Sequence, residues 1–359
     1  MSYTIPIGPY HPALEEPYKI NVSCQGEAVQ HVDIEIGFNF RSIELLAQRR
    51  NYIQVLTLVE RVCGICSNVH TLTLCMAAEA IAGLDLPARA GYIRVVVAEL
   101  ERLHSHLLWA GVAAELIGFQ TMFMEIFALR ELVMDVLEAI SGNRVNYAMN
   151  CIGGVNRDLT DPEAILNAVR QLRRGIERVI IPIFTTDPTV KARTAGVGVL
   201  SRADALAYGA VGPTARASGV AFDLRSDLPY ATYAELEFKM IVESAGDVRA
   251  RVVVRALEML ESIRLIERAL QTMPSGPIRL AERWPVIPPG EATARVEAPR
   301  GEVLYYLAAD GSDIPQRVKI RTPTFVNMPS VQAMSIGQQL ADMPLIQASI
   351  DPCYSCTDR

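Results

Sequence analysis

The feature that most constrains this chain is a pair of Cys-x-x-Cys sequences placed near its opposite ends. Cys63 and Cys66 lie in the N-terminal fifth, and Cys353 and Cys356 lie close to the last residue. The two-residue spacing lets both sulfurs of a pair bind one soft metal ion. A zinc ribbon keeps its two pairs roughly 15–20 residues apart, whereas almost the whole chain separates these. A joint site would form only in a closed fold, which predicts a buried catalytic centre rather than a small structural clip.

Length and composition narrow the class of protein. The 359 residues, half of them hydrophobic, suffice for one large domain or two. We predict a single domain over residues 1–359, with part of its apolar surface covered by partner subunits. The net charge of −6 and the absence of a long basic run argue against nucleic-acid binding. Seven cysteines are too few for a disulfide scaffold of this length, which favours a reducing, cytoplasmic setting.

The most apolar stretch, residues 107–129, raises the question of a membrane span. Glu115, Gln120 and Glu125 interrupt it, and such side chains are costly at the centre of a bilayer. We therefore expect a helix of the protein core, and a chain that is soluble or peripheral to a membrane.

Periodicity predicts a mainly α-helical fold with small β-hairpins, of the α+β class. Residues 18–36 alternate polar and apolar around Gln25-Gly26 and are typical of a hairpin. A second hairpin is expected within 277–325, where the helical period is lost. Apolar residues at three- and four-residue intervals predict helices around 42–58, 66–83, 88–139, 161–182 and 229–272. We expect long core helices, with both ends of the chain converging on the buried metal site.

The residues after the first cysteine pair support a metal site. Ser67 onward is predicted to be helical, so Cys66 lies near a helix N-terminus, where the dipole favours thiolate. His70 follows four residues later on the same face and is suited to donate to a metal-bound sulfur, or it makes a core contact. Four thiolates suit nickel, zinc or an iron–sulfur cluster. The other cysteines, Cys24, Cys75 and Cys151, lack this spacing and are interpreted as ordinary buried residues.

At this point the motifs resemble a known family. Arg-x-Cys-Gly-x-Cys-x-x-x-His over residues 61–70, with Asp-Pro-Cys-x-x-Cys-x-x-Arg over 351–359, resembles the large subunit of [NiFe] hydrogenases. Segments 8–12, 99–109 and 152–158 resemble a narrower group, the energy-converting, membrane-bound hydrogenases of group 4 (Ech and CO-induced types) and the homologous quinone-site subunit of respiratory complex I. The complex I homologue lacks the metal thiolates, so the two cysteine pairs favour the hydrogenase.

The resemblance implies a Ni–Fe centre with defined ligands. Cys63 and Cys353 would be terminal nickel ligands, and Cys66 and Cys356 would bridge nickel to iron. The iron of the family also carries one CO and two cyanides, which no side chain supplies. The protein would hold an open coordination position in a dry pocket.

The resemblance also assigns residues around the metals. Glu16 aligns with the glutamate that carries the proton, with Glu15 as its competitor. His11 corresponds to a histidine of the complex I quinone cavity, and it would pass protons outward or serve as a structural donor.

The segment that covers the diatomic ligands in the family is matched by Pro299 and Arg300. The always-charged guanidinium of Arg300 offers fixed donors. Thr324 matches a hydroxyl that hydrogen-bonds a cyanide, and Asp351 is expected to pair with Arg300.

One departure concerns a third metal. Many family members end in a histidine that helps to bind magnesium or iron, whereas this chain ends in Arg359, which cannot coordinate a metal. Glu44 matches the carboxylate of that site. We therefore expect the Arg359 guanidinium to replace the ion by pairing with Glu44 or a neighbour, which leaves the third metal in doubt.

The partners follow from the same resemblance. The chain has too few spare cysteines for an iron–sulfur cluster of its own, so it would need a [4Fe–4S] small subunit, ferredoxin-like and other hydrophilic subunits, and integral membrane subunits that translocate ions. It would form a peripheral arm on the cytoplasmic side of the cell membrane, taking electrons from reduced ferredoxin. The alternatives are a non-catalytic subunit that shapes a quinone cavity and a zinc-stabilised scaffold.

Overall fold

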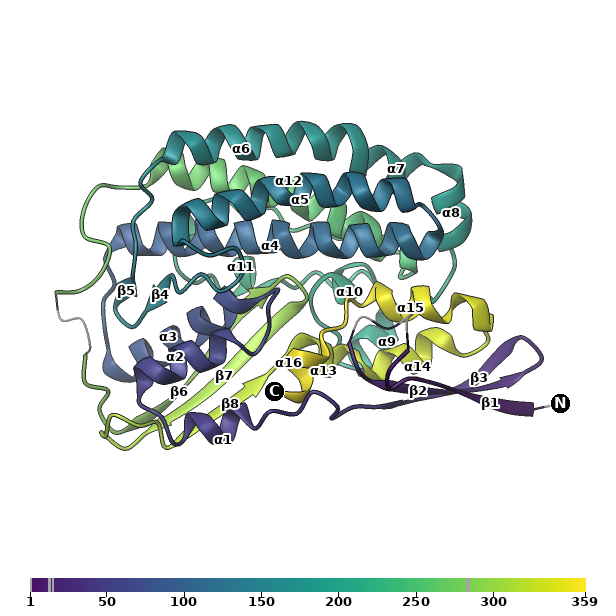
Figure 1. The fold of residues 1–359 in the computed structure, drawn as a ribbon, viewed down its shortest axis with the longest axis horizontal. Coiled ribbons are helices and arrows are strands. Elements are labelled where there is room, and N and C mark those ends of the chain that lie inside the picture. The colour runs from purple at the N-terminus through teal and green to yellow at the C-terminus, as the bar shows by residue number, and fades with distance from the viewer. Residues whose placement is uncertain (1, 12–13, 15, 282–284) are drawn as a thin grey trace.

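The computed structural model describes residues 2–11, 14, 16–281 and 285–359 and is dominated by a bundle of long helices (Figure 1). The bundle consists of α4 (Ala88–Ile117), α5 (Gln120–Ser141), α6 (Pro162–Gly175) and α12 (Val248–Thr272). A π-helical turn (Ile176–Ile180) extends α6 into α7 (Ile181–Thr186), and α8 (Pro188–Thr194) follows. Helices α4 and α12 pack side by side along their length.

Three small antiparallel sheets accompany the bundle. The first has the order β1 (Ser2–Ile7), β2 (Lys19–Gln25) and β3 (Ala28–Glu35), and the second pairs β4 (Asn150–Cys151) with β5 (Gly154–Val155). The third has the order β6 (Gly290–Ala298), β7 (Gly301–Ala309) and β8 (Arg317–Arg321). One side of this third sheet packs against α3 (Ser67–Ala82), the helix that follows the first cysteine pair.

Short helices surround these parts. The N-terminal ones are α1 (Ile43–Ala47) and α2 (Tyr52–Glu60). The middle of the chain contributes α9 (Arg202–Ala207), α10 (Gly212–Arg216), α11 (Leu224–Asp227) and a 3₁₀ turn (Tyr233–Glu235). The C-terminal ones are α13 (Pro323–Asn327), α14 (Pro329–Ser335), a 3₁₀ turn (Leu340–Asp342), α15 (Met343–Ser349) and α16 (Tyr354–Asp358). The C-terminus ends in the interior of the view in Figure 1, whereas β1 lies at the periphery.

The predicted α+β class is confirmed, and the hairpin over 18–36 is β2–β3. Three helical predictions need correction. The stretch 42–58 is broken by a turn at Asn51, whose side chain caps α2, and 88–139 is divided at Gly118, which adopts a left-handed φ of 99°. Residues 229–247 contain a 3₁₀ turn but no α-helix, and α12 starts at Asp247, whose side chain accepts a hydrogen bond from Ala250 N.

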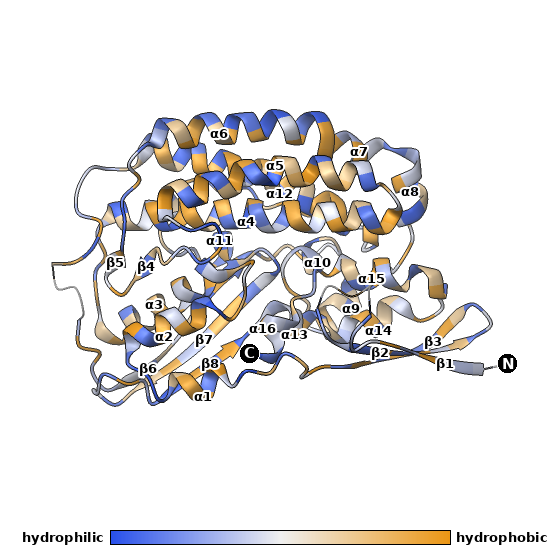
Figure 2. Cartoon of the chain, viewed as in Figure 1, coloured by the Kyte–Doolittle hydropathy of each residue, from blue (hydrophilic) through white to orange (hydrophobic). Residues whose placement is uncertain are grey.

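The long apolar stretch belongs to the bundle, as expected. It forms the end of α4 and the beginning of α5. Within the described part of the chain, no helix has both the length and the apolar character required to cross a membrane. Figure 2 shows hydrophobic and hydrophilic positions mixed along the bundle helices. Several of the polar residues of α4 are buried inside the protein.

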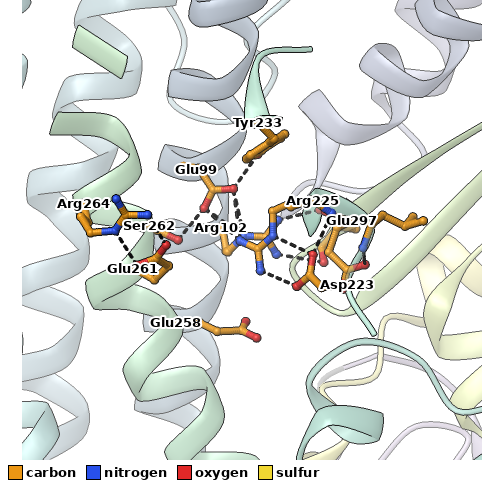
Figure 3. Close-up of polar contacts among 12 residues, drawn as sticks. Glu99, Arg102, Asp223, Arg225, Tyr233, Glu258, Glu261, Ser262, Arg264 and Glu297 are labelled. Atoms are coloured by element: carbon orange, nitrogen blue, oxygen red, sulfur yellow. Dashed lines mark hydrogen bonds and ion pairs between the residues drawn. The ribbon is translucent and has the colours of Figure 1, made fainter. Parts of the chain in front are cut away.

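Three of them, Glu99, Arg102 and His106, belong to one buried cluster of charges, which we call the ion cluster; Figure 3 shows part of it. The ion cluster joins α4, α10, α11, α12 and β6, and its members are Glu99, Arg102, His106, Arg216, Asp223, Arg225, Glu258 and Glu297. Arg216 contacts three carboxylates at 2.8–3.0 Å. Arg225 reaches both Glu99, at 3.3 Å, and Asp223, at 2.8 Å. The cluster therefore ties the bundle to the sheet that carries part of the candidate site.

Candidate metal centre

The fold brings the two cysteine pairs together, although 290 residues separate their equivalent members. Cys66 is the N-cap residue of α3, and Cys353 is the N-cap residue of α16. The sulfur atoms of Cys63 and Cys353 lie 3.4 Å apart, as do those of Cys66 and Cys356, and Cys353 and Cys356 are 3.2 Å apart. All four residues are buried, so the arrangement is a compact set of soft ligands shielded from water. We call it the cysteine cluster.

The electrostatics of the cysteine cluster favour a cation. Hydrogen bonds from Cys353, Cys356 and Cys66 lower the pKa of the Cys63 thiol well below its ordinary value. The same contacts with Cys353, Cys63 and Cys66, together with burial, raise the pKa of Cys356 well above its ordinary value. The cluster thus stabilises one thiolate at the expense of the others. A bound metal ion would favour loss of the remaining protons, as in a four-cysteine metal site.

His70 contacts the cysteine cluster from α3. Its Nε2 lies 3.4 Å from the Cys356 sulfur, and its Nδ1 lies 2.8 Å from the Tyr305 hydroxyl. Burial lowers the pKa of His70 to about 4, so the ring is neutral at pH 7. A single tautomer satisfies both contacts when Nε2–H donates to sulfur and Nδ1 accepts from Tyr305. The histidine expected beside a sulfur therefore contacts the C-terminal pair rather than its own helix neighbour Cys66.

Arg300 and Asp351 form the expected ion pair beside the cysteines. The Arg300 Nη2 and Asp351 Oδ1 atoms are 2.8 Å apart, and Arg300 Nε donates to the Asp351 carbonyl at 2.8 Å. A third donor, Nη1, lies 3.2 Å from Ser105 Oγ on α4. Asp351 has a φ of 56°, and its Oδ2 atom is buried without a hydrogen-bond partner among the described residues. An unsatisfied buried oxygen marks a place where another group is expected.

The backbone fixes Arg300 at a hairpin tip. Ala298 pairs with Gly301, so Pro299 and Arg300 form the two-residue turn between β6 and β7. Gly212 packs against this turn so closely that a Cβ atom there would lie 2.4 Å from the Arg300 carbonyl oxygen. The turn therefore has little freedom to move away from the cysteines.

A small cavity separates this turn from the cysteine cluster. Its lining consists of Cys66, Cys356, Ala298, Pro299, Arg300, Val303, Pro323 and Thr324. The Thr324 hydroxyl accepts a hydrogen bond of 3.0 Å from the Cys353 amide, which leaves its own proton to donate. Guanidinium and hydroxyl donors thus face the two sulfurs that the resemblance assigns to the iron. The donor set fits a Ni–Fe centre with polar diatomic ligands on that side.

Glu16 reaches the other side of the C-terminal pair. Its carboxylate accepts hydrogen bonds from the amides of Tyr354 and Ser355 and from the Ser355 hydroxyl. These residues lie between Cys353 and Cys356, so Glu16 is next to the cysteine cluster. Its competitor Glu15 lies outside the described residues.

Glu16 also lines a large cavity, of about 590 Å³. His11 and Glu115 line the same cavity, and most of its other lining residues are apolar. Glu16 and His11, the two residues expected to transfer protons, therefore line the same cavity, which begins beside the cysteine cluster.

The predicted pairing of Arg359 with Glu44 is present. Arg359 Nε lies 2.9 Å from Glu44 Oε1, and Lys319 Nζ lies 2.9 Å from Oε2. Burial raises the pKa of Glu44, but the hydrogen bonds from Lys319, Ile320 and Arg359 outweigh it and lower the pKa overall. Two cations already neutralise this carboxylate, so the structure gives no reason to add a metal ion there.

Two contacting residues were missed at the level of sequence. Tyr305 was assigned only to a strand, and Glu101 appeared only within a family motif. Glu101 is fully buried on α4, and it accepts hydrogen bonds from the first turn of α3. The sequence gives little signal for Glu101, because Glu99, Arg102 and His104 lie beside it in the same helical stretch.

Comparison with known proteins identifies the family. Residues 41–110 match the model of the nickel-dependent hydrogenases. Residues 117–287 and 280–359 match that of the 49 kDa subunit of respiratory-chain NADH dehydrogenase. The chain belongs to the family of group 4 [NiFe] hydrogenase large subunits, which is homologous to that complex I subunit.

Individual relatives include two hydrogenases and a chain of another respiratory membrane complex. The chain is 46% identical to the carbon monoxide-induced hydrogenase of Rhodospirillum rubrum, over 100% of this chain and 99% of that one. It is 43% identical to the membrane-bound hydrogenase subunit alpha of Pyrococcus furiosus, over 99% and 87%. A chain in the structure of the membrane-bound sulfane sulfur reductase, an archaeal respiratory membrane complex, superposes with a TM-score of 0.95 at 32% identity, over 100% and 98%. These relatives support an oxidoreductase-type subunit of a membrane-bound respiratory complex.

Proposed function

We propose that this chain is the catalytic subunit of an energy-converting hydrogenase, which interconverts H2 with two protons and two electrons at a Ni–Fe centre. The observation that carries the proposal is the convergence of four buried cysteine sulfurs from opposite ends of the chain. Cys63 and Cys353 would hold nickel, and Cys66 and Cys356 would bridge it to iron. When bound, this centre supplies the redox chemistry of H2.

The side chains contribute proton transfer and positioning. Glu16 would accept and release the proton, because its carboxylate touches the backbone between the C-terminal cysteines and also lines the large cavity. His11 would extend the route along the same cavity. Arg300, Pro299 and Thr324 would surround CO and cyanide on the iron, and Asp351 would orient Arg300. His70 would donate to the Cys356 sulfur and limit its basicity.

Electrons must arrive from another subunit. The three cysteines outside the cluster, Cys24, Cys75 and Cys151, are buried, and three are too few for the four thiolates of a [4Fe–4S] cluster. We propose a small subunit with a [4Fe–4S] cluster as the direct partner, and reduced ferredoxin as the electron source. Ion-translocating membrane subunits would hold the chain as a peripheral arm on the cytoplasmic side of the membrane.

The second candidate is a complex I-like subunit without H2 chemistry. The large and mostly apolar cavity beside Glu16 and the match to the 49 kDa subunit favour it. The retained cysteine cluster counts against it.

Nickel analysis combined with H2/D2 exchange separates the two candidates. We expect about one nickel per chain (the family stoichiometry) and exchange activity in the purified complex. A complex without nickel that reduces a quinone would overturn the hydrogenase proposal.

A further inference from the structure

Two glutamates of α4, two residues apart and both fully buried, have opposite surroundings. Glu99 lies within the ion cluster, 3.1 Å from Arg102 and 3.3 Å from Arg225. Glu101 forms no ion pair within the described residues. Its Oε1 accepts from Asn68 N at 2.6 Å, and its Oε2 accepts from Val69 N at 3.1 Å. Backbone amides of another helix therefore donate hydrogen bonds to the Glu101 carboxyl, whereas arginine side chains pair with the Glu99 carboxylate.

The partners of Glu101 are the first amides of α3. Helix α3 begins after Cys66, and the Cys66 side chain makes no capping hydrogen bond. The first amides of a helix have no partner within the helix, and here the carboxylate of Glu101 serves two of them. Ser67 Oγ lies 3.5 Å from Glu101 Oε1 and donates at 2.6 Å to the Val145 carbonyl. The start of α3 is thus fixed from outside, by α4 and the loop that contains Val145.

The second cysteine-bearing helix is fixed in the same manner. Glu16 comes from a distant segment and accepts from the first amides of α16. Each cysteine pair is therefore associated with a helical turn that is held by a glutamate from elsewhere in the chain. The family resemblance gave a role to Glu16 and none to Glu101.

The two carboxyls differ in their pKa values. Burial, opposed by the two amide hydrogen bonds, raises the pKa of Glu101 to about 8. For Glu99 burial acts in the same direction, but Arg102 and Arg225 lower the pKa overall. Burial of a carboxyl without a neighbouring cation is destabilising, and hydrogen bonds to its oxygens offset part of that cost.

We propose that Glu101 is a positioning residue of the metal centre, which holds the first turn of α3 so that Cys66 and His70 meet the C-terminal cysteine pair. The metal part of this inference rests on the proposed function, whereas the positioning of the turn does not. Loss of Glu101 would free the amides of Asn68 and Val69 and let Cys66 Sγ and His70 Nε2 move relative to Cys356.

The test is hydrogen–deuterium exchange of the full-length chain, purified with the subunits that accompany it, in E101Q, E101D and E99Q variants. We expect E101Q to speed exchange in peptides covering 66–71 by roughly tenfold or more, because the glutamine side chain has one acceptor oxygen for the two backbone amides. The E101D variant keeps the carboxyl group on a shorter side chain and should lie between E101Q and the wild type. The E99Q control should speed exchange near α11 and α12 and leave exchange over residues 66–71 as slow as in the wild type.

Metal content and infrared spectra give the second readout. E101Q should retain less nickel and iron per folded chain than E99Q, and any iron-bound CO should absorb at a shifted frequency because Cys66 moves. Unchanged exchange over 66–71 in E101Q, or an equal change in E99Q, would overturn the proposal. If E101Q does not fold, E101D against E99Q decides in the same way. If no variant contains nickel, the proposed function fails, while the exchange result still decides the role of Glu101.

Discussion

The ion cluster and the cysteine cluster are both buried, polar and built from distant segments, yet they differ in how they are neutralised. The ion cluster contains four carboxylates, three guanidiniums and one imidazole, and its members pair with one another. The cysteine cluster contains four acidic groups, and its sulfurs contact one another and His70.

This difference distinguishes a structural network from a binding site. Buried charges that satisfy one another hold elements together, and removal of one partner is strongly destabilising. Buried acids that have only one another as partners are stable as thiolates only when a cation joins them. Asp351 lies two positions before Cys353, and its Oδ2 atom has no partner among the described residues. An unsatisfied oxygen thus lies beside the cysteine cluster. The comparison predicts that variants in the ion cluster change stability, and variants in the cysteine cluster change metal binding.

The largest effect is expected from the bridging cysteines. C66S or C356S should abolish assembly of the binuclear site and H2 turnover, because each removes a sulfur assigned to both metals. C63S or C353S should also be inactive but retain some metal. Metal analysis and H2/D2 exchange measure both effects, with C75S as the control, since Cys75 is buried outside the cluster. Full turnover by C356S with intact metal content would refute the assignment.

The next effect separates proton transfer from metal binding. E16Q should keep the metals and the infrared bands but lose at least roughly a hundredfold of H2/D2 exchange activity, because an amide cannot accept a proton. Its side-chain oxygen can still accept from the amides of Tyr354 and Ser355. The variant E15Q is the control. A fully active E16Q together with an inactive E15Q would show that the neighbouring carboxylate carries the proton.

In the ion cluster, R216M should lower the free energy of unfolding by about 3–5 kcal/mol, because it leaves carboxylates buried without their partner. Chemical denaturation of the full-length chain measures this. Arg144, which pairs with Glu131 and Asp135 at the surface, provides the control, and R144M should cost no more than about 1 kcal/mol. Equal effects of the two substitutions would contradict the structural role of the ion cluster.

A smaller effect concerns pH. Burial and the nearby Asp223 raise the pKa of Glu297 to about 7, and they outweigh Arg216 and Arg225, which lower it. Glu297 therefore binds a proton more tightly in the folded state, so its contribution to stability is complete below about pH 4.5 and is lost as the pH rises to about 7. E297Q should lack this decline between about pH 5 and 7. Parallel pH profiles of unfolding for wild type and E297Q would show that Glu297 is ionised throughout.

Sequence reasoning predicted the parts that depend on spacing or on motifs. The cysteine pairs, the Arg300–Asp351 pair and the Arg359–Glu44 pair meet as expected. It failed at helix boundaries such as Asp247, where a side-chain cap overrides an apolar pattern that continues upstream.

Sequence reasoning also could not pair Glu99 with Arg225, which lies 126 residues away, or give Glu101 a partner, because both depend on tertiary packing. The 3.6-residue period shows that such residues share a helix, but it does not show what faces them.

The central claim is that the cysteine cluster holds a Ni–Fe centre, and infrared spectroscopy of the purified complex tests it most directly. We predict stretching bands of iron-bound CO and cyanide, accompanied by nickel and iron in the elemental analysis and absent from C356S. A protein that contains zinc without nickel, and shows no such bands, would contradict the account.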